Sequence, residues 1–243
     1  MAKGFWSTAF RYGLYDRLMP VNYDLSVREA FASLSPGPED HVLDAGCGSG
    51  RLLVHACGWL RNGGRLTGID IDPAGLAYAA RRARRLGVAK RVRFLQEDLT
   101  RLSGLNLEPV DGVVTHFAIY TLPSSTSRKR ALEELVGLLR GGGKLVFAGP
   151  SESYSADQII AQADRLEAER SDIGGVRRWL RRRLVYPITR RWLGQIQSRI
   201  EAGVFHKFTE SELRGLLESC GLQNVQLESC YSGCGWRATG QKG

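Results

Sequence analysis

The sequence predicts an α/β fold, in which a parallel, doubly wound sheet is covered by helices on both faces. Short apolar runs alternate along the chain with longer amphipathic segments, and glycine or Asn-Gly turns end several of these runs. The first apolar run leads directly into a glycine-rich loop. Strands separated by helices are joined by crossover connections, which place the strands parallel and bury both faces of the sheet.

Five strands are expected in the first 150 residues, each of them a short apolar run: residues 41–45, 65–69, 92–95, 110–115 and 144–148. Helices are expected between them. One covers residues 49–60, and a second begins after Asp72, whose side chain can cap it, with Pro73 at the first helical position. A third covers residues 125–139 and is ended by the glycines at 141–143.

The alternation breaks after the fifth strand. Residues 151–203 are arginine-rich and only intermittently apolar, which predicts an inserted helical lid. The α/β pattern returns at Thr209, a candidate N-cap with Glu212 three residues later, an arrangement typical of a capping box. Two more strands are expected at residues 222–228 and 236–240.

Composition and length support one α/β domain over residues 41–243, preceded by a helical N-terminal cap at residues 1–40. The 243 residues are 43% hydrophobic and 24% charged, which excludes disordered, collagen-like and disulfide-scaffold proteins. The sequence shows neither a signal-peptide core nor the run of about 18–20 apolar residues that a spanning helix needs. Together with an odd number of cysteines, five, these features predict a cytoplasmic protein.

The glycine-rich loop VLDAGCGSG, after the first strand, is the first candidate site. Its glycines are Gly46, Gly48 and Gly50, and Arg51 stands where a dinucleotide-binding loop needs another glycine. Asp44 lies two residues before the first glycine, where a carboxylate repels a pyrophosphate but attracts a cationic ligand. The loop therefore favours a positively charged ligand over a dinucleotide.

Two further acidic positions follow the next two strands. Asp70 ends the second strand, a position from which a carboxylate accepts hydrogen bonds from a ribose diol. Glu97 and Asp98 follow the third strand and can accept a hydrogen bond from the exocyclic amine of a purine. Acids at three successive strand ends predict a pocket for a positively charged nucleoside.

These stretches together resemble the class I S-adenosylmethionine-dependent methyltransferases. The resemblance covers roughly residues 40–150 and 205–240, and it rests on VLDAGCGSG, GIDIDP, FLQEDL, DGVVTHFAIYTLP, LRGGGKLVF and FTESELRGLLESCG. It implies S-adenosyl-L-methionine as the cofactor. It also implies a Rossmann-like sheet of seven strands in the order 3-2-1-4-5-7-6, with strand 7 antiparallel.

The resemblance also implies roles for individual residues. Asp44 would order the loop or hold the amino group of the cofactor, Asp70 would bind the ribose hydroxyls, and Asp98 would accept from the adenine amine. The other cofactor-binding residues that it implies are the loop residues Gly46, Cys47, Gly48 and Gly50, Ile71 against the adenine, Leu99 beside it, and His116.

The segment after the fourth strand, THFAIY at residues 115–120, is where this family places acceptor chemistry. It lacks the Asn/Asp-Pro-Pro-Tyr/Phe motif of the branches that methylate amines of nucleic acids and proteins, which argues against a nucleic-acid partner. His116 and Tyr120 are the candidate catalytic residues, as bases or as positioning groups. A lone histidine is more often a packing residue, so this interpretation of His116 stays open beside the catalytic one. No cysteine or histidine spacing indicates a metal site.

The N-terminal segment is rich in aromatic residues: Phe5, Trp6, Phe10, Tyr12, Tyr15 and Tyr23. Residues 14–19, LYDRLM, resemble the ubiquinone/menaquinone C-methyltransferase-like branch of the family. The resemblance implies that this segment closes the pocket. The amphipathic pattern alone predicts a helix that packs on the edge of the sheet.

Positive charge is concentrated in two stretches. Residues 174–200 hold eight arginines and neither lysine nor acid, and residues 73–96 hold seven basic residues and no acid. In the first stretch apolar residues, including Trp179 and Trp192, recur at three- and four-residue spacing, and Pro187 is expected to divide two helices. Three interpretations of residues 174–200 stay open: a helix at the membrane surface that contacts anionic lipid, a plain lid over a soluble metabolite, and a stripe that binds RNA. Residues 73–96 are either a solvated helix face or a surface for an anionic partner.

The sequence thus favours an enzyme that methylates a small, lipophilic acceptor, an isoprenoid quinone-like compound or a specialised metabolite, with peripheral membrane contact through residues 174–200. The alternatives are phospholipid-amine N-methylation, RNA methylation, and a non-catalytic subunit that binds the cofactor.

Overall fold

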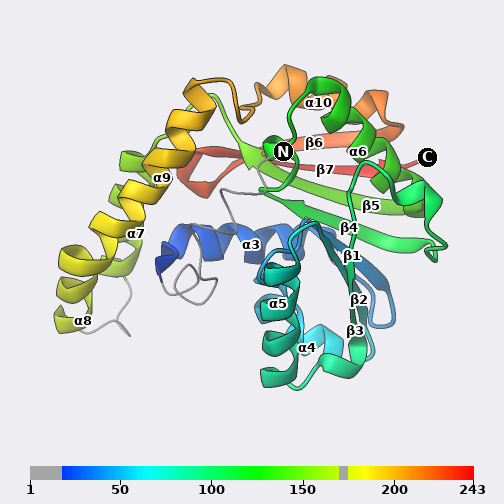
Figure 1. The fold of residues 1–243 in the computed structure, drawn as a ribbon, viewed down its shortest axis with the longest axis horizontal. Helices are drawn as coiled ribbons and strands as arrows, with labels where there is room; N and C mark the ends of the chain where they lie inside the picture. The colour runs from blue at the N-terminus through cyan, green and yellow to red at the C-terminus, as the bar shows by residue number, and fades with distance from the viewer. Residues whose placement is uncertain (1–17, 170–174) are drawn as a thin grey trace.

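The sheet has seven strands in the order β3-β2-β1-β4-β5-β7-β6 (Figure 1). The structure, a computed structural model, describes residues 18–169 and 175–243. Neighbouring strands from β3 to β5 are parallel, and β7 is antiparallel to both β5 and β6. The predicted fold class, strand order and direction of strand 7 are confirmed.

The strands are β1 (His41–Ala45), β2 (Arg65–Asp70), β3 (Val92–Gln96), β4 (Val110–His116), β5 (Leu139–Pro150), β6 (Leu222–Cys230) and β7 (Gly235–Lys242). The largest departure from the prediction is β5, which begins at Leu139 rather than at residue 144. Leu139 pairs with Val110 of β4, and the register then shifts before Gly112 pairs with Lys144. The glycines at 141–143 therefore lie within an irregular start of the strand rather than between helix and strand.

Helices cover both faces of the sheet. On one face lie α3 (Val21–Leu34), α4 (Leu52–Arg61) and α5 (Pro73–Arg85), and on the other lie α6 (Ser125–Leu138) and α10 (Glu210–Ser219). Successive residues of a strand point to opposite faces of the sheet, so each face has its own hydrophobic core. Val42, Val114 and Val146 pack with the first group of helices, whereas Leu43, Val113 and Leu145 pack with the second. This alternation is what a sheet buried on both faces requires.

The two predicted helix caps are confirmed. Asp72 Oδ1 accepts a hydrogen bond from Ala74 N at 3.0 Å at the start of α5. Thr209 Oγ1 accepts one from Glu212 N at 3.2 Å at the start of α10. Each side chain satisfies an amide that would otherwise have no partner in the first turn.

Helix α3 lies across the face of the sheet rather than at its edge. Val27, Ala30 and Leu34 are buried in the same core as Val42. The N-terminal cap expected at residues 1–40 is therefore in part a structural helix of the domain. Phe5, Trp6, Phe10, Tyr12 and Tyr15, and most of the LYDRLM stretch, lie outside the described residues.

The insertion follows β5 at the carboxyl end of the parallel strands and consists of α7 (Ala156–Glu169), α8 (Gly175–Leu180), a π-helical segment (Arg181–Val185) and α9 (Tyr186–Glu201). Helix α7 packs against α9 and α3 (Figure 1). Pro187 lies at the start of α9, and the π segment and α8 precede α9 without a break, so the two helices are joined by the π segment rather than separated by a turn. No described helix is long and apolar enough to cross a membrane.

Short 3-10 turns lie at Ala89–Arg91, Leu102–Gly104, Ile119–Thr121 and Tyr231–Gly233. The last two, η3 and η5, follow β4 and β6, and both contribute side chains to the cavity described below.

Candidate active site

The glycine loop turns sharply between β1 and α4 and is fastened to the end of β2. The amides of Gly46 and Cys47 both donate to the carbonyl of Ile69, at 2.8 and 3.0 Å. A Cβ on Gly46 would lie 2.2 Å from the Cβ of Ala118, whereas one on Gly48 would meet no atom within 4 Å. Both glycines have positive φ, but Gly46 is required by packing and Gly48 leaves space beside the loop.

The predicted carboxylates lie at the edge of the sheet that faces this space. Asp70 Oδ2 accepts from Gly48 N at 2.8 Å and Oδ1 accepts from Asp72 N at 2.9 Å, so Asp70 orders the loop as well as ending β2. Burial raises the pKa of Asp70. Asp44 is 5% exposed, and its side chain has no hydrogen bond within the described part of the chain.

The two carboxyl groups lack a balancing cation. Burial, and secondly the charge of Asp70, raise the pKa of Asp44 to about 7. No arginine or lysine among the described residues forms an ion pair with either group. A cationic ligand at this edge would supply the charge balance that the described residues do not provide.

Asp98, Ile71 and Leu99 lie at the same edge of the sheet, whereas the side chain of Cys47 does not. Asp98 Oδ1 accepts from Thr100 N at 3.0 Å and from Thr100 Oγ1 at 2.8 Å just beyond β3, and Ile71 and Leu99 are half-buried after β2 and β3. The thiol of Cys47 is buried, and a Cβ on Gly68 of β2 would lie 3.0 Å from its sulfur. The Cys47 side chain therefore belongs to the core.

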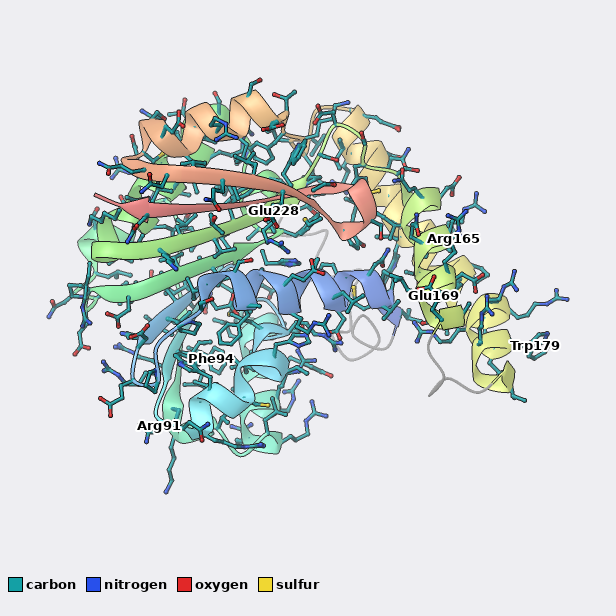
Figure 2. The ribbon with its side chains drawn as sticks, turned by 180° about the vertical axis from the view of Figure 1, so that it is seen from behind. Arg91, Phe94, Arg165, Glu169, Trp179 and Glu228 are labelled. Carbon is teal, nitrogen blue, oxygen red and sulfur yellow. The ribbon has the colours of Figure 1, made fainter. Side chains whose placement is uncertain are left out.

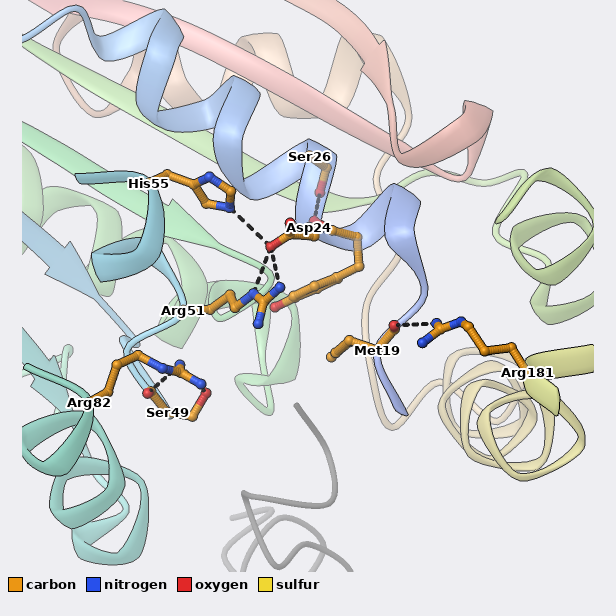
Figure 3. A network of polar contacts seen from close by, with 9 residues as sticks. Met19, Asp24, Ser26, Ser49, Arg51, His55, Arg82 and Arg181 are labelled. Carbon is orange, nitrogen blue, oxygen red and sulfur yellow. Dashed lines mark hydrogen bonds and ion pairs between the residues drawn. The ribbon is translucent and has the colours of Figure 1, made fainter. Parts of the chain in front are cut away.

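Sequence reasoning missed the residues that hold the loop from outside (Figure 3). Arg51 Nε donates to Asp24 Oδ1 of α3 at 2.7 Å, and His55 Nε2 lies 3.0 Å from the same oxygen. Although burial opposes it, the hydrogen bonds and charges of His55 and Arg51 lower the pKa of Asp24 to about 2. The position of Arg51 directly after the last loop glycine indicated that it lies near the loop. Its partner Asp24 could not be predicted, because it lies 27 residues earlier in the chain.

Arg82 does not belong to an exposed basic stripe, contrary to both interpretations of residues 73–96. It is 7% exposed, and its Nη1 donates to the carbonyl of Ser49 in the glycine loop at 2.7 Å (Figure 3). Burial, and secondly the charge of Arg85, lower its pKa to about 10. Arg82 stands among Arg81, Arg84 and Arg85 in the sequence, so its position gave no sign that its side chain faces inward on α5.

His116, at the end of β4, has its tautomer set by α3. Ser26 has one hydroxyl proton and donates it to the carbonyl of Tyr23 at 3.1 Å, so Ser26 Oγ must accept from His116 Nε2, 2.8 Å away. Burial, and secondly the charge of His55, lower the pKa of His116 to about 3. The ring is therefore neutral at physiological pH, with Nε2 protonated and Nδ1 as the acceptor.

Tyr120 lies in η3 and lines a partly open cavity of about 50 Å³ beside this histidine. Half of the wall residues are aromatic, and these come from five separate segments: Tyr23 of α3, Phe117 and Tyr120 after β4, Tyr154 before α7, Trp192 of α9, and Tyr231 of η5. Burial raises the pKa of Tyr120, so its phenol stays protonated across the physiological range. Tyr120 can donate a hydrogen bond but is no base.

Two of these wall residues have strained backbone. Phe117 and Tyr231 both have φ of 50°, a left-handed conformation that bulky residues rarely adopt, and their rings meet edge to face at 5.3 Å. Such strain costs on the order of 1–3 kcal/mol for each residue and is concentrated at functional sites. The segment after β4 is thus held in an unusual conformation that turns Phe117 into the cavity.

Comparison with known proteins agrees with this geometry. Residues 42–143 match a family described as a methyltransferase domain. The crystal structure of magnesium protoporphyrin IX methyltransferase from Synechocystis PCC 6803, with bound S-adenosylhomocysteine, aligns over 99% of this chain and 97% of its own at a TM-score of 0.62 and 16% identity.

Residues 42–143 carry a methyltransferase domain, and the chain has the fold of a solved methyltransferase.

Curated relatives of this domain act on different classes of acceptor. A 23S rRNA (uracil-C5) methyltransferase of Acidithiobacillus ferrooxidans is 32% identical over 50% of this chain and 26% of its own. A release factor glutamine methyltransferase of Moorella thermoacetica is 29% identical over 58% and 56%, and an aklanonic acid methyltransferase of Streptomyces sp. is 27% identical over 56% and 60%. The chain spans between about a quarter and three fifths of these relatives, so the shared domain does not carry over their acceptors.

The cofactor of this domain is S-adenosylmethionine, and the residues present fit it. The uncompensated carboxyl pair Asp44 and Asp70 suits a ligand with a sulfonium and an ammonium group, and Gly48 leaves the space beside them. When bound, the cofactor supplies a methyl group activated by a positively charged sulfur.

Proposed function

We propose that this protein transfers a methyl group from S-adenosylmethionine to a small, apolar acceptor that binds in the aromatic cavity. The observation that carries the proposal is the place of the cavity. Its walls include Phe117 and Tyr120 on either side of Ala118, and Ala118 packs directly against Gly46 of the cofactor loop. An acceptor there lies next to the edge where the cofactor's charged groups are expected.

The lining of the cavity supports the apolar character of the acceptor. It is closed by the inner face of α9, with Trp192, Leu193 and Ile196, and by residues 18–23 before and within α3. Aromatic walls bind flat or apolar groups through area and edge-to-face contacts, and a covered cavity excludes water. Isoprenoid quinone-like compounds and specialised metabolites both belong to this class of acceptor, and the quinone branch is the finer proposal. Either is larger than the cavity of about 50 Å³, so the proposal requires the walls to move apart when the acceptor binds.

In this proposal Asp44, Asp70 and Asp98 bind the cofactor, with Gly46, Cys47, Gly48 and Gly50 shaping the loop and Ile71 and Leu99 flanking the adenine. His116 acts as a positioning group through Nδ1, because a ring with a pKa of about 3 is a weak base. Tyr120 donates a hydrogen bond to the acceptor. The barrier is lowered chiefly by alignment of the acceptor atom with the methyl group.

RNA methylation is the second candidate, favoured by the rRNA methyltransferase relative. The insertion speaks against it, because four of its arginines are already paired with acids of α7: Arg178 and Arg182 with Asp164, Arg181 with Glu167, and Arg190 with Asp157. Paired arginines release fewer counterions from a phosphate backbone.

The test uses S-adenosylmethionine labelled in its methyl group and acceptor pools that are extracted into organic solvent or kept in water. We expect label in an organic-soluble product, and we expect Trp192→Ala to reduce it several-fold while cofactor affinity in calorimetry is unchanged. Ile188→Ala, at a position that is 49% exposed and is not part of the cavity wall, is the matched control and should keep full activity. Label found in RNA, or in phospholipid amines, would reject the proposal in favour of that acceptor.

A further inference from the structure

The exposed apolar side chains of this protein are concentrated on one helical stretch of the insertion. Val176 is 76% exposed, Trp179 56%, Leu180 41%, Leu184 61% and Ile188 49%. Within the described residues, Val204 is the one other large apolar side chain so exposed. Figure 2 shows Trp179 at the outer end of the insertion, pointing away from the sheet.

Two faces of this stretch are apolar, and within the described residues only the inner face packs against the rest of the protein. Buried residues at three- and four-residue spacing form the inner face: Tyr186, Thr189, Leu193, Ile196 and Ile200. The exposed residues between 176 and 188 form the outer face. In a regular α-helix, side chains four residues apart shift gradually around the helix axis. The π segment at Arg181–Val185 has more residues per turn, so Leu180, Leu184 and Ile188 stay in one row.

Charge on this stretch is positive but smaller than the arginine count suggests. Acids of α7 pair with four of the arginines, as described above. Arg183 and Arg191 are exposed, lie three residues beyond Leu180 and Ile188, and have no ion pair with any described residue. The outer face is thus a row of aliphatic side chains and one tryptophan, flanked by two unpaired arginines.

We infer that the outer face of residues 176–188 docks the protein on the surface of a membrane that contains anionic lipid. An apolar row with a tryptophan and flanking arginines matches the boundary between acyl chains and anionic headgroups. A second copy of the chain fits less well, because a symmetric contact would bring Arg183 and Arg191 against their own like charges. The inference goes beyond the proposed function and can be measured without turnover.

The inference is tested by sedimentation of the full chain with vesicles of phosphatidylcholine, alone or mixed with an equal amount of phosphatidylglycerol. We expect binding to the mixed vesicles that weakens with salt but persists in part, since the apolar contribution is not screened. Trp179→Gln with Leu184→Gln should reduce the partition coefficient about tenfold or more. Arg183→Gln with Arg191→Gln should reduce it roughly fivefold for each arginine, on the anionic vesicles alone.

Matched controls separate the face from the rest of the surface. Val204→Gln removes an exposed apolar side chain elsewhere, and Arg84→Gln with Arg93→Gln removes two arginines of the other basic stretch. Both controls should bind vesicles as the unchanged chain does. Vesicle binding that is absent, or that is equal in the face variants and the controls, would overturn the inference. So would RNA binding in a gel shift without vesicle binding, or a dimer that the same face variants dissolve.

Discussion

The two sides of the candidate site differ in how they are built. The edge proposed to bind the cofactor is built from residues 44–70 and Asp98, a short stretch in which carboxylates accept hydrogen bonds from nearby backbone amides. The aromatic cavity draws on Tyr23, Tyr154, Trp192 and Tyr231, which span almost the whole chain. A polar site built from local turns can be predicted from a sequence, whereas an apolar site built by packing distant segments cannot.

The sharpest way to test this division is Asp70→Ala. The variant removes a charged acceptor from the ribose site and also the partner of the Gly48 amide, and hydrogen bonds to charged groups are worth about 1.5–3 kcal/mol each. We expect calorimetry to show cofactor affinity lowered by one to two orders of magnitude. Asp70→Asn, which keeps an acceptor oxygen, should lose less. Unchanged affinity in a folded Asp70→Ala protein would remove Asp70 from the cofactor site.

A second test uses the pH dependence of Asp44. An acid whose folded pKa is raised, here from 3.8 to about 7, binds a proton in the native state that the unfolded chain has released. Stability of the cofactor-free protein is therefore full below 3.8 and falls as pH rises toward about 7. We expect the unfolding temperature to fall by several degrees over this interval, and the cofactor to stabilise the protein more at the upper end. Asp44→Asn should flatten the profile, and an unchanged profile would contradict the assignment.

The ion pair between Asp24 of α3 and Arg51 of the glycine loop joins the two sides of the site, and its loss should have a smaller effect on stability. Asp24 has a pKa lowered to about 2, so its contribution is present above the usual value of 3.8 and lost as pH falls toward 2. Because both partners are about one quarter to one third exposed, we expect Asp24→Asn to lower the free energy of unfolding at neutral pH by only about 1 kcal/mol. Denaturant titration at neutral and acid pH checks this, and a difference that persists at the acid end would contradict it.

The smallest expected effect is that of Ser26, which acts through His116. Ser26→Ala removes the acceptor for Nε2–H, so both ring tautomers become accessible and turnover should fall a few-fold with cofactor affinity unchanged. Ser26→Thr keeps the hydroxyl and should restore turnover. His116→Ala should lower turnover further. Unchanged turnover in this variant would indicate that His116 is a packing residue only.

Much of the fold followed from periodicity and caps. Asp72 and Thr209 cap the helices expected of them, since a cap depends on neighbours within three residues. The start of β5 and the role of Arg82 did not follow, because both are decided by tertiary pairing, with Val110 in one case and Ser49 in the other. Pro187 lies at the start of α9, but the π segment that joins α9 to α8 was not expected. At the candidate site, Asp44, Asp70 and Asp98 could be placed near strand ends from the sequence, and their binding of the cofactor stays a prediction. Tyr23 and Tyr231, 208 positions apart, meet only in the folded chain.

Helix α3 contacts both sides of the site through residues 23–26, about one turn of the helix. Asp24 holds the cofactor loop by Arg51, Tyr23 is a wall of the cavity, and Ser26 sets the tautomer of His116. A ligand that shifts this helix on one side changes the free energy of binding on the other, and thermodynamic reciprocity makes the factor the same in both directions. A weakened Asp24–Arg51 contact would therefore reduce any coupling that runs through this helix, in both directions equally.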